Sequence, residues 1–189
     1  MIRAAILGIA GLLSLTGAQA ALAQSSYPFL EDAYVVPEEL ITPDFRLRML
    51  SVHDVVKDFE AVTVSRAQLL TMFPTWGGWP DGLTLEDNLI DLGWHQREFT
   101  RRNSFAYTVL SPDGSKVIGC VYIDPTRKVG YDAEITLWAR ESAQGEPADR
   151  ALETAVRSWL ATEWPFAKPV FPGRDMSWDA WDSLPTAKR

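Results

Sequence analysis

The sequence has few of the side chains that bind metals or form cross-links. Its 189 residues include one cysteine and two histidines. A single cysteine forms no intramolecular disulfide, and no cysteine cluster is present for zinc or an iron–sulfur centre. His53 and His95 lie far apart, and neither has a second ligand four residues further on. We therefore expect no metal cofactor, and we interpret Cys120 as a small buried side chain.

Basic residues are also scarce. Eighteen Lys and Arg stand against 25 Asp and Glu, which gives a formal net charge of -7. A surface of this sign repels a polyphosphate backbone, so we expect no nucleic-acid partner. Hydrophobic residues make up 47% of the chain and aromatic residues 11%, which at this length is enough for one sizeable core. The composition therefore indicates one folded domain.

Residues 1–23 have the pattern of a cleavable secretory signal. Arg3 supplies a positive start, an apolar and small-residue run follows from Ala4 to Leu15, and small-x-small sites end at Ala20 and Ala23. The run is too short and too rich in Gly and Ala for a comfortable membrane span. We expect export to the periplasm or beyond, with no transmembrane segment after cleavage. An uncleaved anchor or a mistaken start codon is the alternative interpretation.

The ends of the mature chain differ in composition from its centre. Residues 24–40 contain prolines among aromatic and acidic residues, which favours an extended N-terminal arm. Residues 174–189 form an acidic tail that carries Trp178 and Trp181. We hypothesise that this tail docks on the domain and covers part of an open sheet edge.

Periodicity between these ends predicts the order β-α-α-β-β-β-α-β. Apolar residues at every second position indicate strands, and apolar residues three or four apart indicate helices. The expected strands are 45–50, 105–110, 116–123, 133–138 and 168–171. Three helices are expected. The first follows Ser51, the second runs from a capping box at Thr84 and Asp87 to about Arg101, and the third begins near Pro147. The fold class is thus mixed α/β, with a mostly antiparallel sheet and one parallel pair.

With this order and texture, the chain resembles the GNAT superfamily of N-acetyltransferases. The likeness begins at Thr42-Pro43-Asp44-Phe45-Arg46-Leu47-Arg48-Met49-Leu50-Ser51 and continues through a hairpin with an Ile118-Gly119 step. It ends with strand 133–138 and the helix behind it, and covers roughly residues 41–173. The resemblance implies an acyl-CoA N-acyltransferase fold and transfer of an acetyl group from acetyl-CoA to an amine.

In that family, the fourth strand ends at a loop written Arg or Gln, two residues, Gly, one residue, Gly or Ala. Its backbone amides and the following helix end close around the pyrophosphate of coenzyme A. The best match here is Arg140-Glu141-Ser142-Ala143-Gln144-Gly145. The resemblance implies cofactor contacts at Trp138, Arg140, Ala143 and Gly145, within a main-chain cradle between Trp138 and Ala148.

The same segment also allows a simpler interpretation. Ala143 stands where the first glycine belongs, and Pro147 removes one N–H donor. Glu146 and Asp149 place carboxylates at the start of the expected helix, where they complement the helix dipole and repel phosphate. An ordinary acid-capped helix is therefore the alternative.

The resemblance stops after the expected strand at 168–171. In the family another helix and two strands follow, and that helix often supplies a tyrosine that protonates the departing thiolate. The residues after Phe171 are too few for these elements and include no tyrosine. We expect the fold to lack the C-terminal helix and the last two strands.

Acyl transfer to an amine requires a base, and the resemblance implies a strand carboxylate for it. Glu134 is the first choice, because alternation places it on one strand face with Asp132, Thr136 and Trp138. A salt-bridged or solvated strand carboxylate is the alternative. Two tyrosines on paired strands, Tyr107 and Tyr122, either line an acceptor pocket or belong to the core.

Two functions follow. The first is a GNAT-like acetyltransferase that acts on a small-molecule amine. The second is an exported, non-catalytic module of the same fold that binds a small molecule or a cell-envelope partner through aromatic loops such as the one with Trp76 and Trp79. Export and a coenzyme A donor conflict, because this large polyanion does not cross membranes unaided. The sequence alone leaves the enzyme status open.

Overall fold

The computed structural model describes residues 29–140 and 148–187. The expected signal at 1–23 lies outside the described residues, and so do Ala143 and Gly145 of the expected cofactor loop. Within the described ranges, no helix has both the length and the apolar character needed to cross a bilayer.

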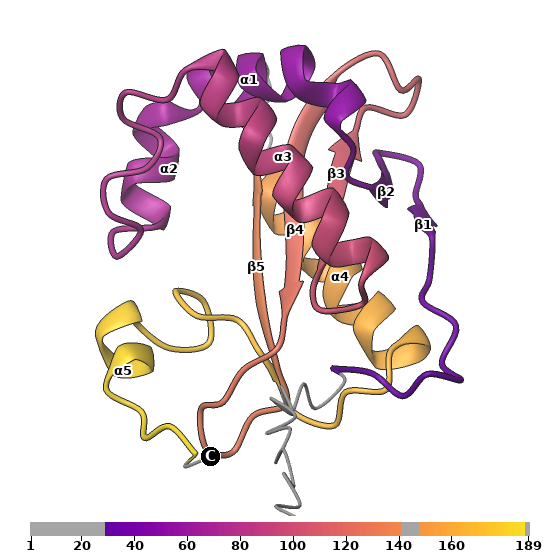
Figure 1. The fold of residues 1–189 in the computed structure, drawn as a ribbon, viewed down its shortest axis with the longest axis vertical. Helices are drawn as coiled ribbons and strands as arrows, with labels where there is room; N and C mark the ends of the chain where they lie inside the picture. Colours follow the sequence, from indigo (N-terminus) through magenta and orange to yellow (C-terminus); the bar gives the residue numbers. More distant parts are fainter. Residues whose placement is uncertain (1–28, 141–147, 188–189) are drawn as a thin grey trace, which may run out of the picture.

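One six-stranded sheet organises the protein, with its strands in chain order from β1 to β6 (Figure 1). The strands are β1 (Glu39–Ile41), β2 (Arg46–Met49), β3 (Phe105–Leu110), β4 (Val117–Asp124), β5 (Ala133–Ala139) and β6 (Pro169–Val170). All neighbours are antiparallel except β5 and β6, which are parallel. The expected mixed α/β class with a mostly antiparallel sheet is therefore confirmed.

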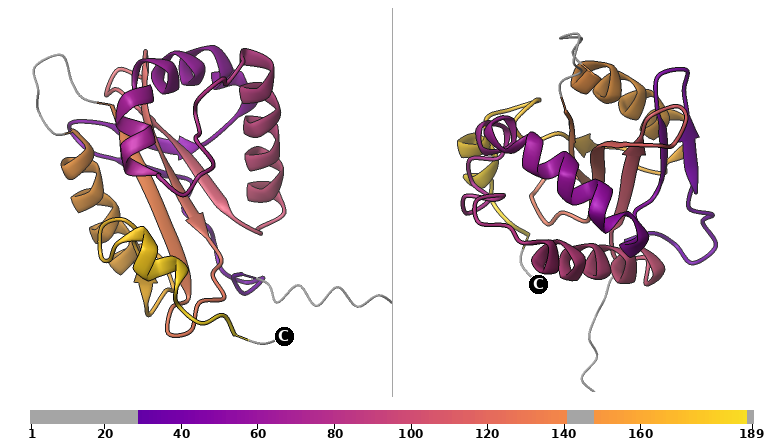
Figure 2. Two further views of the ribbon diagram at one scale, coloured as in Figure 1. Left: turned by 90° about the vertical axis from the view of Figure 1, so that its left-hand side faces the viewer. Right: turned by 90° about the horizontal axis from the view of Figure 1, so that it is seen from above.

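Helices cover both faces of the sheet, as Figure 2 shows. The 3-10 turn η1 (Val52–Asp54), α1 (Val55–Val64), α2 (Arg66–Met72) and α3 (Leu85–Thr100) lie on one side, and α4 (Ala148–Glu163) lies on the other. The expected capping box is present: the Thr84 side chain accepts from the Asp87 N–H, and the Asp87 carboxylate accepts from the Thr84 N–H. It fixes where α3 begins, because it satisfies backbone donors that have no partner within the helix.

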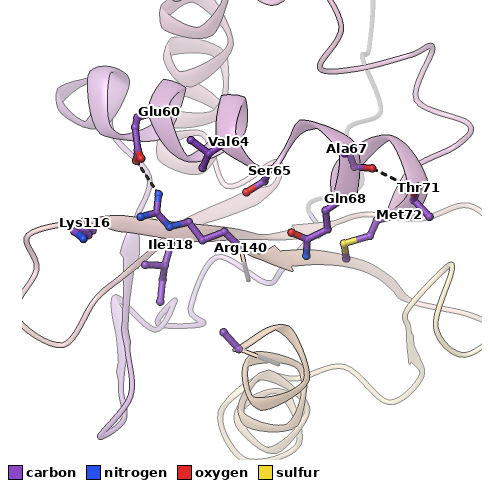
Figure 3. Close-up of a pocket in the computed structure, with 11 residues that line it drawn as sticks. Glu60, Val64, Ser65, Ala67, Gln68, Thr71, Met72, Lys116, Ile118 and Arg140 are labelled. Carbon is purple, nitrogen blue, oxygen red and sulfur yellow. Dashed lines mark hydrogen bonds and ion pairs between the residues drawn. The ribbon is translucent and has the colours of Figure 1, made fainter. Parts of the chain in front are cut away.

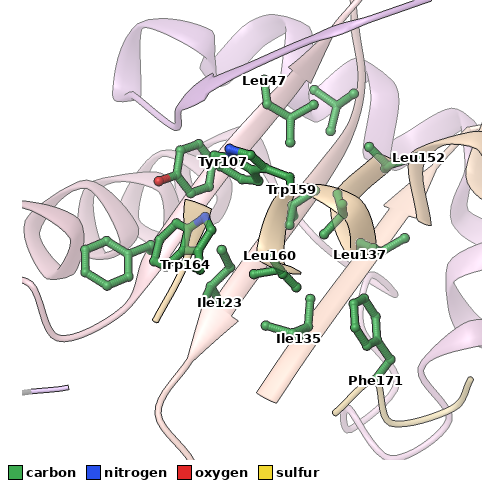
Figure 4. Close-up of a cluster of buried hydrophobic side chains, with 14 of the residues drawn as sticks. Leu47, Tyr107, Ile123, Ile135, Leu137, Leu152, Trp159, Leu160, Trp164 and Phe171 are labelled. Atoms are coloured by element: carbon green, nitrogen blue, oxygen red, sulfur yellow. The ribbon is translucent and has the colours of Figure 1, made fainter. Parts of the chain in front are cut away.

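The core between the sheet and α4 follows from strand alternation. Ile135 and Leu137 point to this side and are fully buried, and α4 contributes Leu152, Trp159 and Leu160 (Figure 4). Burying each of these side chains contributes about 1.5–3 kcal/mol. This hydrophobic core packs α4 against β4 and β5.

Gly119 on β4 shows why an Ile-Gly step occurs in this hairpin. A Cβ at this position would lie 2.0 Å from the Trp138 carbonyl oxygen on β5. No side chain fits there, so glycine permits the close pairing of β4 with β5.

The C-terminal tail docks through a short helix, α5 (Trp178–Asp182). Trp178 and Trp181 are buried, and the Trp178 indole donates to the Met72 carbonyl oxygen of α2 at 2.8 Å. The tail reaches neighbouring backbone through isolated bridges such as Lys128 with Thr186. After β6, the structure describes no further strand, so the tail covers the domain without extending the sheet by a strand.

Three short elements were not expected from the sequence. β1 lies within the predicted arm and pairs with β2, and α2 and α5 were not predicted. Their lengths are 3, 7 and 5 residues, and periodicity needs a longer window to be recognised.

Candidate functional site

Two cavities lie along the β4–β5 pair. The first, here called the Arg140 cavity, has a volume of about 980 Å³ and lies where β5 ends, beneath α1 and α2 (Figure 3). Arg140 directly follows β5, and its guanidinium pairs with the Glu60 carboxylate of α1 at 2.8 Å. Lys116 adds a second cation to the cavity wall.

The Arg140 cavity is rich in hydrogen-bond donors. Ser65 lies in its wall, and its buried hydroxyl has no partner among the described residues. Gln68, also in the wall, donates to the Ala139 carbonyl oxygen at 2.9 Å. The wall thus combines an ammonium, a free hydroxyl and a guanidinium that is shared with the Glu60 carboxylate, and a phosphate that enters would compete with Glu60 for Arg140.

Side chains hydrogen-bond to the edge of β5 where β6 no longer pairs with it. The Leu137 carbonyl oxygen accepts from the Arg174 guanidinium at 2.9 Å, and the Ala139 N–H donates to the Asp149 carboxylate at 3.1 Å. Arg174 also pairs with Asp149 and Glu153, each at 2.8 Å. The charge of Asp149 is therefore compensated, which weakens the repulsion of phosphate expected from this residue.

The second cavity, here called the Asp124 cavity, has a volume of about 600 Å³. It lies between α3, the loop before α3, and the face of β4 and β5 that bears Tyr122 and Thr136. Its wall combines aromatic, apolar and acidic side chains: Trp76, Trp79, Leu83, Asp87, Asp91, Trp94, His95, Tyr122, Asp124 and Thr136. Its character is opposite to that of the Arg140 cavity.

Asp124 and Glu134 are paired across β4 and β5 in the strand register. Burial raises the pKa of Asp124 to about 6, against a hydrogen bond from Ser104. Burial, followed by the charges of Asp124 and Asp182, raises the pKa of Glu134 to about 7, against Lys128 and a Trp181 hydrogen bond. Carboxylates with such values can accept a proton near neutral pH.

Of the residues that alternation placed on the face of Glu134, Thr136 lies in the wall of the Asp124 cavity, and Asp132 and Trp138 have other surroundings. Asp132 accepts from the backbone N–H groups of Ala167 and Lys168 and so holds the chain before β6. Trp138 is fully buried in the core and gives no surface to the Arg140 cavity. Arg140 lies in that cavity, and Glu134 lies beside Asp124.

The two tyrosines considered for an acceptor pocket have different surroundings. Tyr122 lines the Asp124 cavity. Tyr107 belongs to the core on the α4 side, and its hydroxyl donates to the Pro37 carbonyl oxygen at 2.6 Å. Cys120 is buried, as expected, and burial raises its pKa well above the usual thiol value.

The sequence interpretation missed the acidic members of the Asp124 cavity. Asp124 is one alternation step beyond Tyr122, just past the predicted strand end. Asp87, Asp91 and Trp94 are spaced three or four residues apart on α3, which places them on one helix face. No cluster of three metal-ligating side chains occurs in the described ranges.

Comparisons with solved structures give the same fold. The ribosomal-protein-S5-alanine acetyltransferase from Vibrio fischeri aligns with a TM-score of 0.52 and 15% identity, over 65% of this chain and 66% of that chain. RimL, a ribosomal L7/L12 alpha-N-protein acetyltransferase solved in complex with coenzyme A, aligns with a TM-score of 0.52 and 18% identity over the same shares. The microcin C7 self immunity acetyltransferase MccE, in complex with acetyl-CoA and AMP, aligns with a TM-score of 0.51 and 10% identity, over 69% and 71%.

The chain therefore has the GNAT superfamily fold, as the resemblance implied. It spans 66% of the length of the first two of these acetyltransferases. No protein-family model and no curated protein sequence matches the chain. At identities of 10–18%, the structural likeness defines the fold and not the substrate.

Proposed function

We propose that this protein is an N-acetyltransferase that moves an acetyl group from acetyl-CoA to a small-molecule amine. The observation that carries the proposal is the Asp124–Glu134 pair, with pKa values of about 6 and about 7, beside a cavity of about 600 Å³ on a GNAT fold. A base with a pKa near the working pH is what deprotonation of an ammonium requires.

In this proposal the Arg140 cavity receives the donor. Arg140, Lys116 and the free Ser65 hydroxyl supply the positive charge and hydrogen bonds that a diphosphate needs. Ala143 and Gly145 remain predicted contacts of the same donor. The neighbouring acetyltransferase structures with bound coenzyme A or acetyl-CoA support this class of cosubstrate.

The chemistry assigned to the carboxylate pair is general-base catalysis. Glu134, the first choice for the base, takes one proton from the ammonium of the acceptor, directly or through Asp124. The amine lone pair then attacks the thioester carbonyl carbon, the C–N bond forms and the C–S bond breaks. Two protons leave the nitrogen overall: one ends on the coenzyme A thiol and the other is released to solvent.

A non-catalytic, exported module that binds a small molecule or an envelope partner is the second candidate. The observation that favours it is the set of tryptophans in the Asp124 cavity, Trp76, Trp79 and Trp94, which can bind a ligand without reacting with it. The export signal expected at residues 1–23 also favours it, because an exported protein has no supply of cytosolic acetyl-CoA.

Calorimetry and product analysis separate the two candidates. We expect the purified protein to release heat with acetyl-CoA and to produce acetylated amine, detected by mass spectrometry across a panel of small amines. Absence of any acetyl-CoA binding would refute the transferase proposal. Binding of amines with no acetylated product from any of them supports the second candidate.

A further inference from the structure

We propose that the Asp124 cavity is a binding site for a primary amine carried on a flat apolar body, such as an arylalkylamine. This deepens the proposed function by naming the class of acceptor, and it rests on that function only for the claim that the bound amine is acetylated. The binding itself follows from the charge, the ring geometry and the size of the cavity.

The first argument is charge. Three carboxylates, Asp87, Asp91 and Asp124, line the cavity, and no Lys or Arg is among its wall residues. Burial lowers the pKa of His95, although Asp91 opposes this, so the imidazole is neutral at pH 7. Lys128, whose charge acts on Glu134, donates to the carbonyl oxygens of Asp182 and Leu184 and is thereby held by the tail. The uncompensated charge attracts a cation and repels an anion.

The second argument is the arrangement of aromatic rings. The Trp76 and Trp79 rings lie 5.7 Å apart and are tilted by 52°, and Trp76 meets Tyr122 at 6.3 Å and 66°. Trp94 also lines the cavity and is 45% exposed. Rings inclined in this way offer faces both to a flat apolar group and to an ammonium.

The third argument is the kind of cation that fits. A primary ammonium has three donors, and the wall provides carboxylates and the Thr136 hydroxyl to accept them. A quaternary ammonium has no N–H to give. A volume of about 600 Å³ lies within the range of small-molecule sites and holds one ring system with its side chain.

The proposal predicts a pH dependence with a definite sign. A bound ammonium favours the ionised forms of Asp124 and Glu134, so binding should release protons in the pH range around the pKa values of the two groups, about 6 and about 7. Affinity falls as pH drops, because both groups are then protonated. The charged and titratable groups in or beside this region are Asp87, Asp91, His95, Tyr122, Asp124, Glu134, Lys128 and Asp182.

The proposal is tested by measuring, in the absence of acetyl-CoA, the affinities of three probes of similar shape by calorimetry. Phenethylamine is the cation, phenethyl alcohol its neutral analogue and hydrocinnamate its anionic analogue. We expect phenethylamine to bind at least about tenfold more tightly than the other two. Benzyltrimethylammonium, which has a ring and a charge and no N–H, should bind with intermediate affinity.

Variants locate the binding in the cavity. Asp124→Asn should weaken phenethylamine binding about tenfold, and Trp94→Phe should weaken it less. Asp44→Asn is the matched control, because it removes one exposed carboxylate from the β1–β2 turn and changes the net charge equally. Circular dichroism checks that each variant is folded.

The outcomes are decisive. Equal binding of the three probes would mean an apolar pocket with no preference for charge and would overturn the proposal, as would no binding at all. Amine binding that Asp124→Asn and Asp44→Asn leave equally intact would place it elsewhere. Amine binding in this cavity with no acetyl transfer would refute the transferase and leave the amine site standing.

Discussion

The Arg140 cavity and the Asp124 cavity lie along the same pair of strands, yet they have opposite chemistry. The first contains a guanidinium, an ammonium and a free hydroxyl, whereas the second contains carboxylates and indole rings. Burial raises the pKa of Asp124 on β4 to about 6 and that of Glu134 on β5 to about 7, so these two carboxylates can take up protons near neutral pH. In the proposed reaction, the first cavity would receive the anionic donor and the second the cationic acceptor.

The largest expected effect comes from removing the base at the acidic end. Glu134→Gln keeps the shape of the side chain but accepts no proton, so kcat should fall about a hundredfold with little change in the KM for acetyl-CoA. In the unchanged protein, kcat should rise with pH and level off above about pH 7, because the carboxylate acts only when ionised. Steady-state kinetics at several pH values measure both.

A stability measurement on the same variant excludes misfolding. The raised pKa of Glu134 means that the folded state holds this proton more tightly than the unfolded state does. Ionisation of Glu134 therefore lowers the free energy of unfolding as the pH rises from 4.5, the ordinary pKa of a glutamate, to about 7, its pKa in the folded protein. Glu134→Gln should then melt no lower than the unchanged protein at pH 8. Full activity in the variant would refute the assignment of the base.

The next largest effect concerns the β5 edge near the Arg140 cavity. Arg174→Met leaves Asp149 and Glu153 without their shared partner and the Leu137 carbonyl oxygen without a donor. We expect a loss of about 2 kcal/mol in the free energy of unfolding, measured in urea. Arg150→Met, an exposed change on α4, the helix that carries Asp149 and Glu153, should cost less than about 0.5 kcal/mol. Equal losses in the two variants would contradict the role of Arg174.

The smallest effect tests whether the two cavities act separately. Arg140→Gln removes a cation from the first cavity only, so acetyl-CoA should bind about tenfold more weakly while phenethylamine binding is unchanged. Arg101→Gln, an exposed change at the end of α3, is the control. Calorimetry measures both ligands. A change in amine binding instead of acetyl-CoA binding would reverse the assignment of the cavities.

The sequence predicted the fold well where the pattern is long and local. The capping box at Thr84 and Asp87 marked the start of α3, and the turn residues between two β-rich runs predicted the β3–β4 hairpin. β1 and α2 were missed because each is too short for its periodicity to be recognised.

The candidate site was predictable only in part. Glu134 and Arg140 came from the family resemblance, and the structure puts them near different cavities. The Asp124 cavity joins a loop, a helix and two strands, so no local pattern reveals it. The full burial of Trp138 depends on α1 and α2 lying over it, which strand alternation alone does not specify.

The contacts of Arg174 and Asp149 with β5 also bear on self-association. A strand edge with free N–H and C=O groups invites pairing with another chain, and proteins protect such edges in several ways. Here the Leu137 carbonyl oxygen and the Ala139 N–H are already bonded to charged side chains. Intermolecular strand addition at this edge would have to displace an ion-pair network, so we expect the arginine that anchors this network also to oppose aggregation through the edge.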